Sequence, residues 1–253
     1  MNDTLMVNEV YLSLQGESTF AGLPCIFVRL TACNLRCSYC DTAYAFTEGR
    51  RRTVADVHDE VRRLASAAQD RCRVVASAGP EAGHRLPLVE FTGGEPLLQP
   101  RASGLMAALC DEGFTVLVET SGAHDIGTLD PRVRRIMDLK CPSSGEEARN
   151  RWANVPLLRA TDEVKFVVGT WEDYAWMRDV VQREVLPGRC PVLVSWAGPL
   201  TEAQRDPSLR PVPPGHRPMT RRELADAVIA DRLPIRFQLQ MHKFVWTPDA
   251  RGV

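Results

Sequence analysis

The sequence predicts an α/β protein whose strands form a parallel sheet, closed into a whole or partial βα barrel. Short apolar runs rich in β-branched residues alternate with segments of helical periodicity along most of the 253 residues. Such alternation is typical of successive βα units, in which helices cover the sheet. The length and the 44% hydrophobic content suit one domain of barrel size, and no internal repeat is visible.

Seven segments have the composition of buried strands. Each is a short run of mainly Val, Ile, Leu and Phe, bounded by polar or turn-forming residues. The predicted strands are residues 26–30, 88–92, 114–120, 135–140, 163–169, 191–196 and 235–240. In parallel α/β folds the carboxyl ends of the strands carry the chemistry, so the residues that follow these runs are candidates for a site.

Two helices are predicted in the first half of the chain. The first covers 53–69 and has Thr53 as its expected N-cap. Its apolar side comprises Val54, Val57, Val61, Leu64 and Ala68. The second covers 102–112 and is ended by Gly113.

Two further helices are predicted in the second half. Thr170 is the expected N-cap of the third helix. The buried side of that helix is predicted to carry Tyr174, Met177, Val181 and Val185. Thr220 and Glu223 form a predicted capping box for the fourth helix, over 219–231.

Three segments interrupt this alternation. Residues 73–87 are rich in Ala, Gly and Pro and predict a surface insertion. Residues 197–218 are polar and Pro-rich, which indicates a long loop rather than a linker between domains. Residues 247–253 are expected to be a loose tail. We therefore expect one domain over 1–253.

The bulk composition excludes several classes of protein. A formal net charge of −1 gives no basic surplus for general nucleic-acid binding. The N-terminus does not have the pattern of a signal peptide, and no apolar run is long enough to span a membrane. The expected location is the cytoplasm, where thiols stay reduced, so clustered cysteines indicate metal or redox chemistry.

Cys33, Cys37 and Cys40 lie in the loop directly after the first predicted strand, spaced Cys-x3-Cys-x2-Cys. Four-iron clusters normally take four thiolates, so three thiolates leave one iron with an open position. The alternatives are a structural zinc site, which would need a fourth ligand that is not found nearby, and simple packing of three thiols. The scattered Cys72, Cys110, Cys141 and Cys190 are expected to pack as small apolar residues or to be free.

The cysteine spacing resembles that of the radical S-adenosylmethionine (radical SAM) superfamily. Four other motifs, "LQGEST" (14–19), "TGGEPLLQ" (92–99), "DLKCPSSGE" (138–146) and "LQMHKFVW" (239–246), resemble those of the 7-carboxy-7-deazaguanine synthase family. The resemblance spans about residues 12–246 and implies a partial βα barrel of the radical SAM type. It also implies a carbon–nitrogen lyase of queuosine and 7-deazapurine biosynthesis, and homodimers are common in the family.

The resemblance implies a 4Fe-4S cluster on the three cysteines, with SAM bound to the open iron. One electron from a donor such as flavodoxin or ferredoxin would cleave SAM to a 5′-deoxyadenosyl radical. The residues implied in binding SAM are Tyr39, Cys40, Asp41, Gly93, Gly94, Glu95, Asp138, Leu139, Lys140 and Ser195. Glu95 is expected to hydrogen-bond the SAM amino group, and glycines at 93 and 94 allow backbone to approach a ligand closely.

The implied substrate is 6-carboxy-5,6,7,8-tetrahydropterin, which would be converted to 7-carboxy-7-deazaguanine with release of ammonia. The residues implied in binding it are Leu14, Gln15, Gly16, Glu17, Arg29, Thr92 and His242. Arg29 is expected to bind the carboxylate and Glu17 the guanidine-like edge. Thr42 of "CDT" would bind Mg²⁺, which also holds the substrate carboxylate. No catalytic side chain is assigned beyond the cluster and SAM.

Simpler interpretations stay open for several of these residues. Arg29 could form a salt bridge, Thr42 could cap its loop and His242 could be structural. Ser143, Ser144, Lys165 and Lys243 receive no role from the sequence. Seven residues follow Trp246, which leaves open the substrate contact that the terminal carboxylate makes in some family members.

Two other functions compete with this interpretation. An activating enzyme for a glycyl-radical protein would also carry Cys-x3-Cys-x2-Cys, but it would not require "LQGE" or the C-terminal "HK". A non-catalytic module that binds zinc, with RNA as its candidate partner, would leave "TGGEP" unexplained.

Overall fold

The computed structural model describes residues 3–71, 85–247 and 250–253. In these residues, nine strands form one sheet in the order β3-β1-β2-β4-β5-β6-β7-β8-β9. The strands are β1 (Thr4–Leu14), β2 (Pro24–Leu30), β3 (Arg50–Thr53), β4 (Leu88–Gly93), β5 (Val116–Thr120), β6 (Arg134–Asp138), β7 (Glu163–Val168), β8 (Val192–Trp196) and β9 (Arg236–Gln238). All seven predicted strands are present, and each pairs in parallel with its neighbour from β2 to β9.

Strands β1 and β3 were not predicted, and they make one edge of the sheet antiparallel. β1 pairs antiparallel with β2 and with β3. The segment from Thr4 to Leu14 lacks a continuous apolar run, and its register shifts between Val7 and Glu9. β1 lies between β2 and the edge strand β3 and is only partly buried, so its sequence does not have the apolar character of the buried parallel strands.

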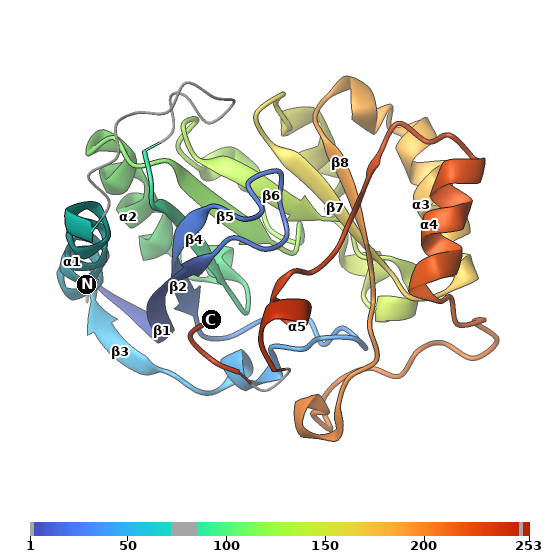
Figure 1. Ribbon diagram of the computed structural model, residues 1–253, viewed down its shortest axis with the longest axis horizontal. Coiled ribbons are helices and arrows are strands. Elements are labelled where there is room, and N and C mark those ends of the chain that lie inside the picture. Colours follow the sequence, from blue (N-terminus) through green and yellow to red (C-terminus); the bar gives the residue numbers. More distant parts are fainter. Residues whose placement is uncertain (1–2, 72–84, 248–249) are drawn as a thin grey trace.

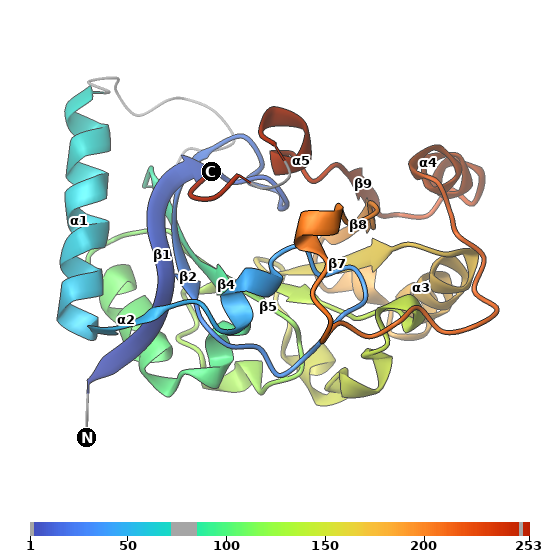
Figure 2. The ribbon, with the colours of Figure 1, turned by 90° about the horizontal axis from the view of Figure 1, so that it is seen from below.

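The sheet is strongly curved but does not close. β3 and β9 are its two edges, and β9 is only three residues long. Figure 1 shows the sheet spread across the molecule, and Figure 2 shows it as an open crescent with α5 and the C-terminus over the concave side. The structure is therefore the expected partial barrel.

Helices cover only part of the convex side. They are α1 (Val54–Arg71), α2 (Pro100–Asp111), α3 (Trp171–Arg183) and α4 (Arg221–Ala230), whereas the short α5 (His242–Val245) lies over the concave side (Figure 2). Apart from β6, the described chain between β5 and β7 has only 3₁₀ turns, of which the longest is Trp152–Leu157. The predicted caps are confirmed: the hydroxyls of Thr53, Thr170 and Thr220 accept hydrogen bonds from backbone N–H groups three residues on.

One predicted helix position is wrong. Val185 does not lie on the buried side of α3, because that helix ends at Arg183. The backbone of Val185 is left-handed, with a φ of 51°, and the residue is 63% exposed. Val185 continues the helical spacing of Tyr174, Met177 and Val181 in the sequence, but the helix ends before it, where the chain turns toward β8.

The buried side chains form two clusters on opposite faces of the sheet. The larger fills the space between the sheet and the helices. The smaller lies inside the crescent and contains Phe20, Cys25, Leu88, Leu117 and Ile136. This inner cluster closes the amino-terminal end of the half-barrel, which leaves the carboxyl ends of the strands for a site.

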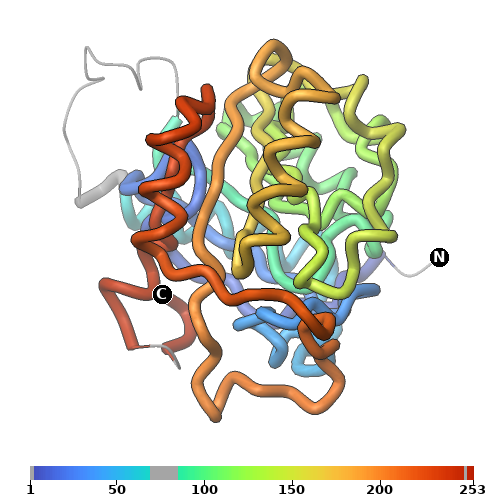
Figure 3. Tube along the Cα trace, turned by 90° about the vertical axis from the view of Figure 1, so that its right-hand side faces the viewer, coloured from blue at the N-terminus to red at the C-terminus, as the bar shows by residue number. Residues whose placement is uncertain are grey.

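Two of the three irregular segments contact other described parts of the chain. The predicted insertion 73–87 falls almost wholly outside the described residues. Residues 197–218 join β8 to α4 and extend beside the cysteine loop (Figure 3), where Arg210 N donates to Arg36 O at 2.8 Å. The tail expected to be loose is held in its described part, since Arg251 forms an ion pair with Glu48 and lies over the Tyr44 ring.

None of the described helices combines the length and apolar character needed to cross a bilayer.

Candidate active site

A cavity of about 560 Å³ opens at the carboxyl ends of the strands, on the concave side of the sheet. Alternate residues of the parallel strands reach it because successive side chains of a strand point to opposite faces. Phe27 and Arg29 of β2 line it, as do Glu90 and Thr92 of β4. Most of the predicted site residues also line it: Leu14, Gln15, Gly16, Glu17, Cys33, Cys37, Tyr39, Cys40, Asp41, Thr42, Gly93, Gly94, Asp138, Lys140 and His242.

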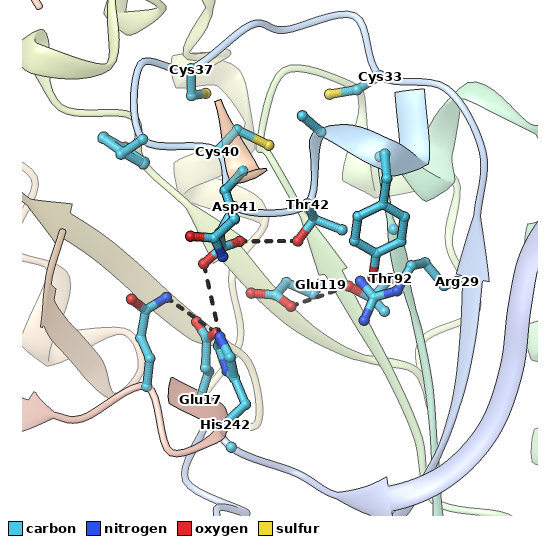
Figure 4. A pocket seen from close by; sticks show the side chains of 18 of the residues that line it. Glu17, Arg29, Cys33, Cys37, Cys40, Asp41, Thr42, Thr92, Glu119 and His242 are labelled. Carbon is cyan, nitrogen blue, oxygen red and sulfur yellow. Dashed lines mark hydrogen bonds and ion pairs between the residues drawn. The ribbon is translucent and has the colours of Figure 1, made fainter. Parts of the chain in front are cut away.

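The three predicted cluster ligands lie at one end of this cavity. Figure 4 shows the sulfur atoms of Cys33, Cys37 and Cys40 around a common space, above Asp41 and Thr42. Burial raises the pKa of the Cys37 thiol to about 11 and that of Cys40 to about 12. Thiols buried so deeply need a cation to stabilise their thiolate forms, and iron would supply it.

The number and spacing of the thiols fit a cluster better than a structural zinc site. Cys-x3-Cys-x2-Cys supplies three ligands, whereas a structural zinc ion would take four. Three thiolates are enough for an iron–sulfur cluster in which one iron stays open.

Gly93 and Gly94 allow β4 to pass close to the cysteine loop. A Cβ atom on Gly93, whose φ is 125°, would lie 2.2 Å from the carbonyl oxygen of Leu30, and one on Gly94 would lie 2.0 Å from that of Ala32. Gly94 N and Glu95 N donate to these two oxygens at 3.0 and 2.8 Å. The absence of side chains is therefore required by contact with the loop that carries the cysteines.

Three residues predicted to bind SAM do not line the cavity. Glu95 is fully buried, and its carboxylate accepts hydrogen bonds from Leu97 N, Thr120 Oγ1, Ser121 N and Ser121 Oγ. It therefore positions Thr120 and Ser121, which do line the cavity. Leu139 packs in the outer core, whereas Ser195 is buried on the face of β8 opposite to the outer-core residues Val192 and Val194.

At the other end of the cavity, Lys165 joins three carboxylates from different parts of the chain. Its Nζ lies 2.9 Å from Glu17 Oε2 and 3.6 Å from Asp138 Oδ1, and it also contacts Glu119 Oε1. Burial opposes ionisation of Glu17, but Lys165 and then His242 outweigh it and lower its pKa to about 2. Glu17 is therefore an ionised hydrogen-bond acceptor at this end of the cavity.

Arg29 lies in a pocket wall of aromatic and acidic groups. Its Nε donates to Glu9 Oε1 at 2.8 Å, its Nη2 donates to Tyr11 OH at 2.6 Å, and the guanidinium lies over the rings of Tyr11 and Tyr44. The salt bridge that the sequence left open is present, but it is partly buried and faces the cavity. The salt bridge thus fixes the position of the guanidinium at the cavity wall.

His242, Lys243, Asp41 and Thr42 form a network between the C-terminal "HK" and the cysteine loop. Lys243 Nζ lies 2.7 Å from Asp41 Oδ2, and His242 Nδ1 lies 3.3 Å from Glu17 Oε1. Thr42 Oγ1 donates to Asp41 Oδ1 at 3.0 Å (Figure 4). The network ties the thiol end of the cavity to the Glu17 end.

Similarity to known proteins extends over nearly the whole chain. A family model described as the Radical SAM superfamily matches residues 28–183. The 7-carboxy-7-deazaguanine synthase of Koribacter versatilis is 38% identical over 98% of this chain and 100% of its own length. That of Chlorobaculum tepidum is 40% identical over 98% of this chain and 97% of its own. This chain belongs to the 7-carboxy-7-deazaguanine synthase family.

Membership in this family implies a 4Fe-4S cluster and SAM as cofactors, and it does not favour the glycyl-radical activating enzyme. The fold is similar to that of QueE from Escherichia coli, with a TM-score of 0.60, 20% identity and 94% of each chain covered. It is also similar to SuiB from Streptococcus suis, with a TM-score of 0.54, 13% identity, and 83% of this chain and 48% of that chain covered. At these identities the two structures support the fold alone.

Sequence reasoning missed three charged residues on strands that line the cavity of this family member: Glu90, Glu119 and Lys165. Each is a charge inside an otherwise apolar strand, in "LVEFT", "VLVET" and "EVKFVV". Charged residues are almost never fully buried unless they are paired. That rule could have marked all three as candidates, although it could not have shown that they share one cavity.

Proposed function

We propose that this protein converts 6-carboxy-5,6,7,8-tetrahydropterin to 7-carboxy-7-deazaguanine, with release of ammonia, for queuosine or another 7-deazapurine. One observation carries the proposal: the three thiols share a single cavity with Glu17, Arg29, Thr92 and His242, which come from four separate segments. The cavity is lined by both charged and aromatic side chains, as a flat, polar heterocycle with a carboxylate would require.

Cys33, Cys37 and Cys40 would hold the cluster, and Tyr39, Gly93, Gly94, Asp138 and Lys140 lie where SAM would bind beside it. Cluster and SAM together supply the one-electron chemistry that removes a hydrogen atom from a bound substrate. The hydroxyl of Tyr39 and Oδ1 of Asp138 are buried without a hydrogen-bond partner among the described residues. Such atoms fit a polar ligand that would satisfy them.

The chain's own residues would bind and orient the heterocycle. The ionised Glu17 accepts hydrogen bonds from its N–H groups, and Arg29 binds its carboxylate at the opposite wall. Residues 203–206 and the described tail residues Ala250, Arg251 and Val253 also line the cavity and would limit the access of water. Positioning and exclusion of water are the main contributions expected of a protein in radical chemistry.

Arg29→Ala is expected to raise the KM for the pterin roughly 10- to 100-fold, because a charge-assisted hydrogen bond to the carboxylate is lost. Cluster content and uncoupled SAM cleavage should be retained, as measured by iron analysis and by formation of 5′-deoxyadenosine. Arg134→Ala is the matched control, since Arg134 lies over the Phe20 ring and away from the cavity. Loss of the cluster in Arg29→Ala would contradict this role.

We further propose that Mg²⁺ binds at Thr42 with the substrate carboxylate. The support is a hydroxyl that lines the cavity beside the ionised Asp41, whose pKa Lys243 and His242 hold well below its usual range against the effect of burial. Thr42→Val should raise the Mg²⁺ concentration for half-maximal turnover at least about tenfold. Thr42→Ser, which keeps the hydroxyl, should resemble wild type, and equal Mg²⁺ responses in both variants would exclude a ligand role.

The proposed function is tested by anaerobic incubation of the reconstituted protein with SAM, Mg²⁺, reductant and the pterin. The expected products are 5′-deoxyadenosine and 7-carboxy-7-deazaguanine, identified by mass spectrometry. 5′-Deoxyadenosine without the deazapurine would leave the radical SAM assignment intact and contradict this substrate.

The resemblance to the family also supports three further proposals, on the electron donor, the oligomeric state and the location in the cell. The electron donor would be flavodoxin or ferredoxin, the enzyme would act as a homodimer, and it would work in the cytoplasm without membrane or direct nucleic-acid contact. Light scattering of the reconstituted protein would test the dimer, and turnover with purified flavodoxin in place of a chemical reductant would test the donor.

A further inference from the structure

The carboxyl group of Glu90 is fully buried in the cavity wall. Glu90 is in the middle of β4 and has 0% exposure, yet it is among the residues that line the cavity. On the same face of the strand, Leu88 belongs to the inner apolar cluster and Thr92 lies at the carboxyl end. Glu90 therefore stands between the apolar end of the half-barrel and the proposed substrate.

Only one of its two oxygens is satisfied by the described residues. Oε2 accepts a hydrogen bond from Gln15 Nε2 at 3.1 Å, whereas Oε1 is buried and has no hydrogen-bond partner among them. Gln15 Oε1 in turn accepts from Glu17 N at 2.9 Å and Ser18 N at 3.0 Å. A buried polar atom without a partner is unusual and calls for a ligand that can satisfy it.

The surroundings of Glu90 disfavour its charged form. Burial is the main cause, the Glu119 carboxylate adds to it, and together they raise the pKa of Glu90 to about 8 despite the opposing effects of Gln15 and Lys165. Glu17 also acts to raise it. Tyr11 and Cys25 face Glu90 from β1 and β2, and the pKa of each is itself raised by burial, so both are neutral.

We propose that Glu90 is an un-ionised acid whose Oε1 hydroxyl donates a hydrogen bond to an acceptor atom of the bound heterocycle, either a carbonyl oxygen or a ring nitrogen. Glu17, which is ionised, can only accept, and Glu90 supplies the complementary donor through a network that Gln15 connects. The two carboxyl groups thereby select a ligand with N–H groups at one position and an acceptor at another. This inference rests on the proposed function and makes Glu90 a specificity-determining residue.

The test compares wild type with Glu90→Gln and Glu90→Met, each reconstituted with cluster and SAM. The dissociation constant of the pterin is measured anaerobically across about two pH units on either side of 8. Wild-type affinity should fall by up to about tenfold per pH unit above the pKa of Glu90, as the donor is lost. Glu90→Gln keeps a donor that does not titrate, so its affinity should lack this fall. Any titration of the ligand affects both proteins alike and cancels in the comparison.

Glu90→Met removes the donor and leaves Gln15 unpaired, so its affinity should be roughly 10- to 100-fold weaker than that of wild type below the pKa of Glu90, and this difference should shrink above it. An infrared difference spectrum between wild type and Glu90→Gln, recorded without cofactors, should show the carbonyl stretch of an un-ionised carboxyl. Identical pH profiles of wild type and Glu90→Gln, or equal weakening in the Gln and Met variants, would overturn this inference alone. Absence of pterin binding by wild type would contradict the proposed function as well.

Discussion

Replacement of Cys33, Cys37 or Cys40 by Ala is expected to abolish assembly of the 4Fe-4S cluster and to reduce SAM cleavage to that of a protein-free control. Among the described residues, these three cysteines are the ones that line the cavity, so the loss of any one leaves only two thiols there for a cluster that already has an open iron. The visible absorbance and the iron content after anaerobic reconstitution measure the first effect. Formation of 5′-deoxyadenosine measures the second.

Cys110→Ala is the matched control. Cys110 is buried on α2 in the outer core and does not line the cavity. Its replacement should therefore leave cluster content unchanged and cost only a modest loss of packing. If a cavity cysteine could be replaced without loss of iron, or if each variant held one zinc ion per chain, the cluster assignment would be wrong.

Replacement of Lys165 by Met should lower the free energy of unfolding by about 3–5 kcal/mol, because it leaves carboxylates without their buried cation. Lys165 is 3% exposed and contacts Glu17, Glu119 and Asp138. Urea denaturation of the protein without cofactors measures the change. The KM for the pterin should rise as well, since Glu17 loses the contact that fixes its carboxylate.

The pH dependence of the same variant gives a second check. The depressed pKa of Glu17, about 2 against an ordinary 4.5, contributes stability that is present above pH 4.5 and is lost as the pH falls toward 2. The stability difference between wild type and Lys165→Met should therefore shrink over that range. A difference that stayed constant would mean that the lost stability comes from packing rather than charge.

Two further variants test whether the loss of stability in Lys165→Met comes from its buried carboxylate contacts. Arg178→Met removes an exposed ion pair with Asp231 and should cost less than about 1 kcal/mol. Adding Glu119→Gln to Lys165→Met removes one of the uncompensated carboxylates and should restore part of the stability. No recovery in the double variant would show that Glu119 and Lys165 are not energetically coupled.

The family, the positions of seven strands and the helix caps could be predicted because each depends on residues close together in the chain. The spacing of Cys33, Cys37 and Cys40 lies within eight residues, and a cap such as Thr220 with Glu223 lies within a single turn. Single polar residues at strand ends were less informative. Glu95 follows a strand and a glycine pair, yet its carboxylate faces Thr120 and Ser121 rather than the cavity.

The sequence by itself determined the cysteine motif, the βα alternation and the partial barrel that the family motifs imply. Only the tertiary structure decided that β1 and β3 form an antiparallel edge, and that Lys165 meets a carboxylate 148 residues away. The physical reason is that helical and strand periodicity act over a few residues. The pairing register and the curvature of a nine-stranded sheet decide which charges of distant strands share one buried space.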